Sequence, residues 1–112
     1  MGHYGKISEE VFDFLGNLQK ESPEVGKSFM DLHKAGTRGG ALGPKYKELI
    51  AVALSVTSHC EGCISVHVKS ALDAGASREE IIDAIGVAIL MGGGPAFYSG
   101  KKAYDALLEY TA

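Results

Sequence analysis

Apolar residues recur at helical spacing along this chain, beginning near its N-terminus. Val11, Phe14, Leu15 and Leu18 fall on one face of a helix, and Ser8 is a suitable N-cap residue for it. A β-strand would need apolar and polar residues to alternate, and no stretch of the sequence has that alternation. The pattern therefore predicts an all-α fold.

Two further helices are marked by proline at their first turn. The pair Ser22-Pro23 is an N-cap residue followed by proline, and we expect this second helix to end near Gly36. A third helix is predicted over residues 44–57, again with proline at its first position. Residues 49–56 are apolar on nearly every side, which indicates a buried central helix.

The C-terminal half is expected to contain three more helices, which brings the total to about six. The first begins at Cys60, and the second follows a capping box made by Ser77 and Glu80. The glycines at 92–94 and the proline after them separate this helix from a last one that ends near Tyr110. We interpret the glycine run as a tight interhelical turn, because it lacks the Lys-Ser/Thr of a phosphate-binding loop and no strand precedes it.

Length, composition and charge restrict the class of protein. With 112 residues, the chain is expected to form one domain over residues 1–112, and its 46% hydrophobic and 22% charged residues are typical of a globular protein. The net charge of -3 without a basic run argues against binding to nucleic acid or to a membrane, and no apolar run reaches membrane-spanning length. Two cysteines without a signal peptide favour the reducing cytoplasm.

The candidate chemistry is concentrated in the stretch that holds both cysteines. If Cys60 begins a helix, then Cys63 lies one turn on and His67 one turn further, so that all three side chains share a face. The thiolate is the reactive form of cysteine, and the positive end of a helix dipole favours it. His67 can add base catalysis, so the three residues are suited to dithiol redox chemistry.

Other interpretations of these cysteines were weighed. Two cysteines in an apolar helix can simply pack in a core. Cys60, Cys63 and His67 could also bind a metal ion, with His59 or Glu61 as a fourth ligand. Structural zinc sites usually combine two ligand pairs that are well separated in sequence, and this chain has one pair, so no metal is expected. A structural disulfide is disfavoured because the three-residue step closes almost no loop.

Two other titratable residues have ordinary interpretations when they are considered one at a time. Glu48 lies at the polar-to-apolar edge of the third helix, where a carboxylate is normally solvated and favoured by the helix dipole. His33 follows the apolar face of the second helix, and we interpret it as a residue that packs or faces solvent.

These residues together carry a resemblance to a known family. From about residue 44 to residue 108 the chain resembles the carboxymuconolactone decarboxylase family, and within it the alkylhydroperoxidase D (AhpD)-like branch. The matching motifs are Lys47-Glu48-Leu49-Ile50, Cys60-x-x-Cys63 with His67, Gly75-Ala76-Ser77-x-Glu79-Glu80-Ile81, and Gly94-Pro95-Ala96. The resemblance implies an AhpD-like helical bundle, in line with the predicted all-α fold.

The resemblance also implies a role for Glu48. In the AhpD-like branch, a glutamate twelve residues before the first cysteine forms a proton relay with the histidine four residues after the second, and Glu48 and His67 match these positions. AhpD itself carries a further histidine between its cysteines, whereas this chain has Glu61 and Gly62 there. The implied catalytic residues are therefore Cys60, Cys63, His67 and Glu48, and general dithiol chemistry is the firmer implication.

Three classes of function follow from these observations. The first is a thiol–disulfide oxidoreductase or alkylhydroperoxidase-like antioxidant enzyme, which acts on a peroxide or disulfide, takes electrons from an unidentified thiol donor and needs no cofactor. The second is a carboxymuconolactone decarboxylase-type lyase, which requires a proton donor and an anion clamp and whose members generally lack the CxxC. The third is a metal- or redox-sensing oligomeric binding protein.

The amount of apolar sequence also predicts assembly. A 112-residue domain buries a modest share of its surface, and the apolar surplus is most easily covered by another subunit. The family resemblance implies trimers or hexamers with the CxxC near subunit contacts. We therefore expect a homo-oligomer, in the form of a hexamer built as a trimer of dimers, with an interface that draws on the N-terminal helices, Phe97, Tyr98 and Tyr104.

Overall fold

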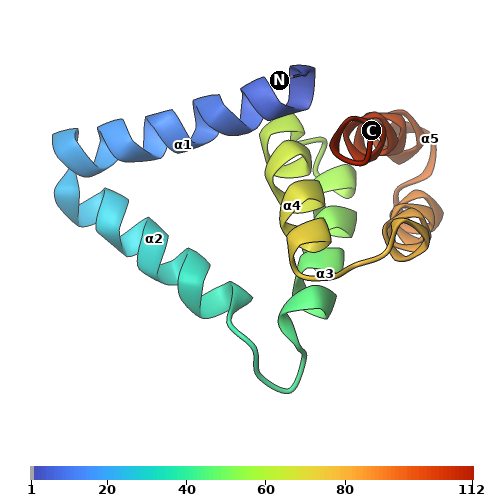
Figure 1. Cartoon of the computed structure of the whole chain (residues 1–112), viewed down its shortest axis with the longest axis horizontal. Helices are drawn as coiled ribbons and strands as arrows, with labels where there is room; N and C mark the ends of the chain where they lie inside the picture. Colours follow the sequence, from blue (N-terminus) through green and yellow to red (C-terminus); the bar gives the residue numbers. More distant parts are fainter. Residues whose placement is uncertain (1) are drawn as a thin grey trace.

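The structure is a computed structural model that describes residues 2–112. Its helices are α1 (His3–Glu21), α2 (Pro23–Thr37), α3 (Pro44–Thr57), α4 (Glu61–Asp73) and α5 (Arg78–Tyr110) (Figure 1). No strand occurs in this part of the chain, so the predicted all-α class is confirmed.

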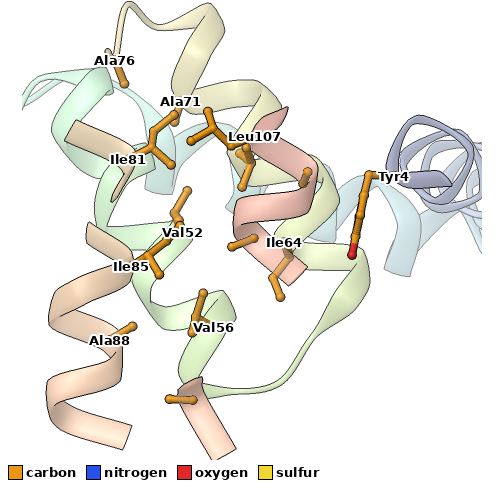
Figure 2. Close-up of a cluster of buried hydrophobic side chains, with 14 residues drawn as sticks. Tyr4, Val52, Val56, Ile64, Ala71, Ala76, Ile81, Ile85, Ala88 and Leu107 are labelled. Atoms are coloured by element: carbon orange, nitrogen blue, oxygen red, sulfur yellow. The ribbon is translucent and has the colours of Figure 1, made fainter. Parts of the chain in front are cut away.

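The helices are arranged as a body and an arm. The body consists of α3, α4 and both halves of α5, which pack on one another, while α1 and α2 form an arm that diverges as a V (Figure 1). The core lies in the body, where Val52, Ile64 and Leu107 are fully buried (Figure 2). The arm adds one buried apolar side chain, Tyr4. Burial of apolar surface therefore stabilises the body far more than the arm.

The expected count of about six helices is slightly off: the last two predicted helices are both present, but they join at Gly93 into the single element α5. The predicted interhelical turn is instead a kink at one residue, Gly93, whose φ of 69° and ψ of -151° are not helical. Only glycine adopts positive φ without steric cost, and helical hydrogen bonding resumes directly after it. At Gly92 an added Cβ would lie 2.6 Å from the Cβ of Ala96, so the run also permits a close approach of the chain.

The predicted start of the first helix is also wrong. Helix α1 begins at His3, and Ser8 lies inside it. The reason is a tertiary contact: the carboxylate of Glu109 on α5 accepts the N–H groups of Tyr4 and Gly5, each at 2.9 Å. A side chain from the far end of the sequence therefore satisfies the free donors at this helix end, as a local N-cap would do.

Helix α3 is central, as expected, but only part of its apolar surface is buried. Val52 and Val56 are fully buried, whereas Tyr46, Ile50 and Leu54 are between 47% and 62% exposed. These three residues are spaced by four and lie in one stripe along the helix. A single chain therefore leaves one apolar face of α3 open to solvent.

Helix α5 is long and apolar enough to cross a membrane by length and composition alone, although the sequence analysis expected no such run. The difference arises because the apolar residues of α5 are interrupted by Asp83 and by the glycines at 92–94, so no uninterrupted apolar run is seen in the sequence although the mean hydropathy of the helix is high. The kink at Gly93 breaks the axis of α5, and Ile81, Ala96 and Leu107 are buried against the rest of the body. The apolar window of this helix is nevertheless only 22% buried, so α5 also presents apolar side chains on the surface of the single chain.

Candidate active site

The turn between α3 and α4 positions the first cysteine. The N–H of Cys60 donates to the carbonyl of Ser55 at 3.1 Å, and the N–H of His59 donates to the carbonyl of Val56 at 3.2 Å. This pair of bonds is a Schellman motif, in which His59 occupies the left-handed position with a φ of 56°. The motif ends α3 and delivers Cys60 directly to the start of the next helix.

Cys60 is the N-cap residue of α4, so the helix begins at Glu61, one residue after the predicted start at Cys60. Its Sγ accepts the backbone N–H of Cys63 at 3.1 Å, so the sulfur itself serves as the helix cap. Both cysteines are free thiols; Cys60 is half-buried and Cys63 is exposed. The sulfur of Cys60 therefore lies at the positive end of the α4 dipole.

Glu48 and His67 meet between α3 and α4. The Nδ1 of His67 lies 2.8 Å from Oε2 of Glu48, and the two side chains are 19% and 9% exposed. The interpretation of Glu48 as a solvated first-turn residue is therefore wrong. Because the carboxylate engages Nδ1, it fixes the orientation of the ring and leaves Nε2 as the nitrogen that can exchange a proton.

His67 and Cys63 share a pocket of about 470 Å³. The remaining lining residues are Ala51, Leu54, Ser55, Thr57 and Ser58. Although Cys63 is partly open to solvent, apolar surroundings raise the pKa of its thiol to about 11, and a hydrogen bond to Cys60 and the charge of that sulfur act in the same direction. In the described part of the chain no hydrogen bond joins His67 to either sulfur, so proton transfer would need a water molecule or a small movement.

His33 also reaches this site, which the sequence reasoning did not detect. It comes from α2, and its ring centroid lies 6.0 Å from that of His67 with a tilt of 31°. The interpretation of His33 as a packing residue holds, but the group on which it packs is the candidate catalytic base. No local signal could have found this contact, because it depends on how the arm folds back toward the body.

The two residues considered as a fourth metal ligand make other contacts. Nδ1 of His59 lies 2.7 Å from the Oγ of Ser99, and Oε2 of Glu61 lies 3.4 Å from His3 and 4.0 Å from Lys102. Within residues 2–112, no group of three or more His, Cys, Asp and Glu side chains is arranged to hold a metal ion. The geometry of the site is therefore that of two thiols beside a carboxylate–imidazole pair.

Comparison with known proteins places this arrangement in a family. The model of the carboxymuconolactone decarboxylase family matches residues 23–106. A protein of Cupriavidus necator with no assigned function is 40% identical over 101 residues, which cover 88% of this chain and 89% of that protein.

Solved structures give the same result. A carboxymuconolactone decarboxylase family protein from Legionella pneumophila superimposes with a TM-score of 0.93 at 38% identity, covering 97% of each chain. A family protein from Thermotoga maritima, described as a candidate for a role in an antioxidative response, has a TM-score of 0.84 at 30% identity and covers 93% of this chain and 89% of its own. The chain belongs to the carboxymuconolactone decarboxylase family.

Proposed function

We propose that the protein is a CxxC-dependent thiol–disulfide oxidoreductase with AhpD-like alkylhydroperoxidase activity. The observation that carries the proposal is the part-buried Glu48–His67 hydrogen bond of 2.8 Å, set beside two free cysteines at the start of a helix. The antioxidative role suggested for the Thermotoga maritima relative supports the same class of chemistry.

The reaction cycle uses both thiols. One cysteine thiolate attacks the terminal oxygen of a hydroperoxide, the O–O bond breaks, and the departing alkoxide takes a proton to leave as an alcohol. The resulting sulfenic acid is attacked by the other cysteine, which forms the Cys60–Cys63 disulfide and releases water. An external dithiol then reduces the disulfide and becomes oxidised itself.

The two protonation roles follow from the geometry. Cys60 gains most from the helix N-terminus, because its sulfur already accepts an N–H group. Cys63 has a pKa of about 11, so it stays protonated at neutral pH unless a base removes its proton. His67, oriented by Glu48, is that base in our proposal, and it returns the proton to the departing oxygen.

The lining of the pocket supports this function over that of a lactone decarboxylase. A lactone substrate with carboxylate groups needs a cation to bind it, and among the described residues that line the pocket there is no lysine or arginine. Beside the pocket, the acidic side chain of Glu48 lies 2.8 Å from Nδ1 of His67. We therefore propose an uncharged peroxide or disulfide as the substrate and keep lactone decarboxylation as the alternative to be tested.

A redox-partner assay tests the proposal. Dihydrolipoamide, thioredoxin-like and glutaredoxin-like donors are each combined with several organic peroxides, and consumption of peroxide is followed for the wild type, Cys60→Ser and Cys63→Ser. We expect turnover with at least one pair for the wild type and none for either variant. Lys69→Ala, on the exposed side of α4, is the matched control and should retain turnover. Full turnover by Cys60→Ser would overturn the dithiol cycle.

We also propose that the protein acts in the cytoplasm as a homo-oligomer, and specifically as a hexamer built from three dimers. The support is the large exposed apolar surface of a single chain, on both helices of the arm and at Phe97, Tyr98 and Tyr104. The two free thiols support a reducing compartment.

A further inference from the structure

His59 has a backbone conformation that its residue type does not favour. It is the one non-glycine residue with positive φ in the described part of the chain, at 56°. It stands at the Schellman position that glycine usually occupies, because glycine has no Cβ to clash there. Histidine tolerates this region better than most residues but less well than glycine. The presence of a ring at this position therefore calls for a reason beyond the turn itself.

The side chain of His59 supplies such a reason. Its Nδ1 lies 2.7 Å from the hydroxyl of Ser99, which is 5% exposed and belongs to the half of α5 that follows the kink at Gly93. Within residues 2–112, His59 is the one side chain that forms a hydrogen bond with this hydroxyl. A buried hydroxyl without a partner is unfavourable, so the contact stabilises both residues. It ties the turn between α3 and α4 to a third helix.

The next residue along the chain is Cys60, which gives this contact a chemical consequence. The Sγ of Cys60 caps α4 only while the turn holds the side chain over the N–H of Cys63, at the observed 3.1 Å. We propose that His59 is a positioning residue for the thiol pair, and that it acts by anchoring the turn to Ser99 so that the Cys60 sulfur stays at the helix N-terminus. This inference rests on the proposed function for its importance to turnover, but its effect on Cys60 can be measured without turnover.

Three variants separate the ring from the backbone. His59→Gly removes the ring while it relieves the positive φ, Ser99→Ala removes only the partner hydroxyl, and His59→Asn keeps a polar atom at the position of Nδ1 in a residue that accepts positive φ. All three are made in a Cys63→Ser background, so that alkylation at neutral pH reports on Cys60 alone. Circular dichroism confirms that each variant is folded.

The inference predicts a specific pattern of rates. His59→Gly and Ser99→Ala should each slow alkylation of Cys60 by about three- to tenfold, the effect expected for one lost hydrogen bond. The double variant should be no slower than either single one, because both remove the same contact. His59→Asn should restore most of the rate. If His59 served the backbone alone, His59→Gly would react at the rate of its parent.

The redox equilibrium gives a second readout with the native thiol pair. A hydrogen bond to the Cys60 sulfur stabilises the reduced form, so its loss in His59→Gly or Ser99→Ala should shift the equilibrium with dithiothreitol toward the disulfide by about three- to tenfold. Unchanged alkylation and an unchanged equilibrium in Ser99→Ala would overturn the inference. A wild type without peroxide turnover would instead refute the proposed function, while these two measurements would still decide the role of His59.

Discussion

The arm and the body of this protein are both built from amphipathic helices, yet they bury very different shares of their apolar side chains. Val52 and Ile64 in the body are fully buried, whereas Phe14 in α1 is 64% exposed and Leu32 in α2 is 70% exposed. The candidate site follows the same division: Glu48, both cysteines and His67 belong to the body, and the arm adds the ring of His33. The body thus contains the buried core and the reactive turn, whereas the arm adds almost nothing to that core. Apolar faces without a partner in the single chain occur on both helices of the arm and also on α3 and α5 of the body.

The largest expected difference between the body and the arm is in peroxide turnover, because the Glu48–His67 relay belongs to the body. His67→Ala is expected to slow peroxide turnover by about 10²–10⁴-fold, because general base catalysis is typically of that size. Glu48→Gln should cause a smaller loss, since it weakens the orientation of the ring without removing it. His33→Ala removes the one side chain that the arm contributes to the site, and it should reduce the rate of turnover least of the three variants. Steady-state rates at saturating donor provide the measurement.

The same series has an outcome that contradicts the account. If His33→Ala were as slow as His67→Ala, the arm would carry an essential catalytic group and the division between the two regions would be wrong. If His67→Ala and Glu48→Gln both kept the rate of the wild type, the helix N-terminus would be the activator and no relay would exist.

Stability should also separate the body from the arm. Ile64→Ala removes a fully buried side chain and should lower the free energy of unfolding by about 2–5 kcal/mol. Phe14→Ala removes an exposed side chain and should change the stability of the isolated chain by about 0.5 kcal/mol or less. Urea denaturation at low protein concentration is the measurement. Equal losses for the two variants would mean that the arm buries more than a single chain shows.

Assembly gives the arm its expected role. The wild type should have the mass of a hexamer in light scattering at micromolar concentration, since the exposed apolar faces of α1 and α2 need a partner. A variant with serine at Phe14, Phe29 and Leu32 should dissociate into smaller species that retain helical circular dichroism. A wild type that is monomeric, folded and active would contradict this prediction.

A smaller effect is expected within the body, in the way that alkylation of the Cys63 thiol depends on pH. Its pKa of about 11 lies above the usual thiol range, so its alkylation rate should rise about tenfold per pH unit through neutral pH and level off near pH 11. In Cys60→Ala the hydrogen bond and the charge of the neighbouring sulfur are lost, and the midpoint should move down. Burial, the largest cause, remains, so the midpoint should stay above the ordinary value. A midpoint that is unchanged in Cys60→Ala would show that the two sulfurs are not coupled.

Local sequence signals predicted those parts of the fold that local interactions determine. The helix predicted over residues 44–57 matches α3, and the capping box of Ser77 and Glu80 is confirmed by hydrogen bonds of 3.1 and 2.8 Å. The start of α1 was missed because Glu109 supplies its cap across the molecule. The kink at Gly93 was located in sequence but taken for a turn, because a glycine run has no signal that distinguishes the two.

In the candidate site, too, the sequence predicted only what local interactions determine. The spacing of Cys60, Cys63 and His67 was enough to place them on the first turns of one helix, since that arrangement is local. Glu48 entered through the family resemblance, because nothing near it in sequence indicates that it is buried against His67. The contacts of His33 and His59 depend on packing between distant helices, and no pattern in the sequence could have predicted them.

The central claim is that Cys60 and Cys63 form a reversible redox pair. Reduced wild-type protein is treated with one equivalent of an organic hydroperoxide, and its intact mass and disulfide content are measured before and after addition of a dithiol. The account predicts the loss of two hydrogens, a Cys60–Cys63 disulfide within one chain, and full return to the reduced mass with the dithiol. An unchanged mass, or uptake of oxygen without formation of that disulfide, would contradict it.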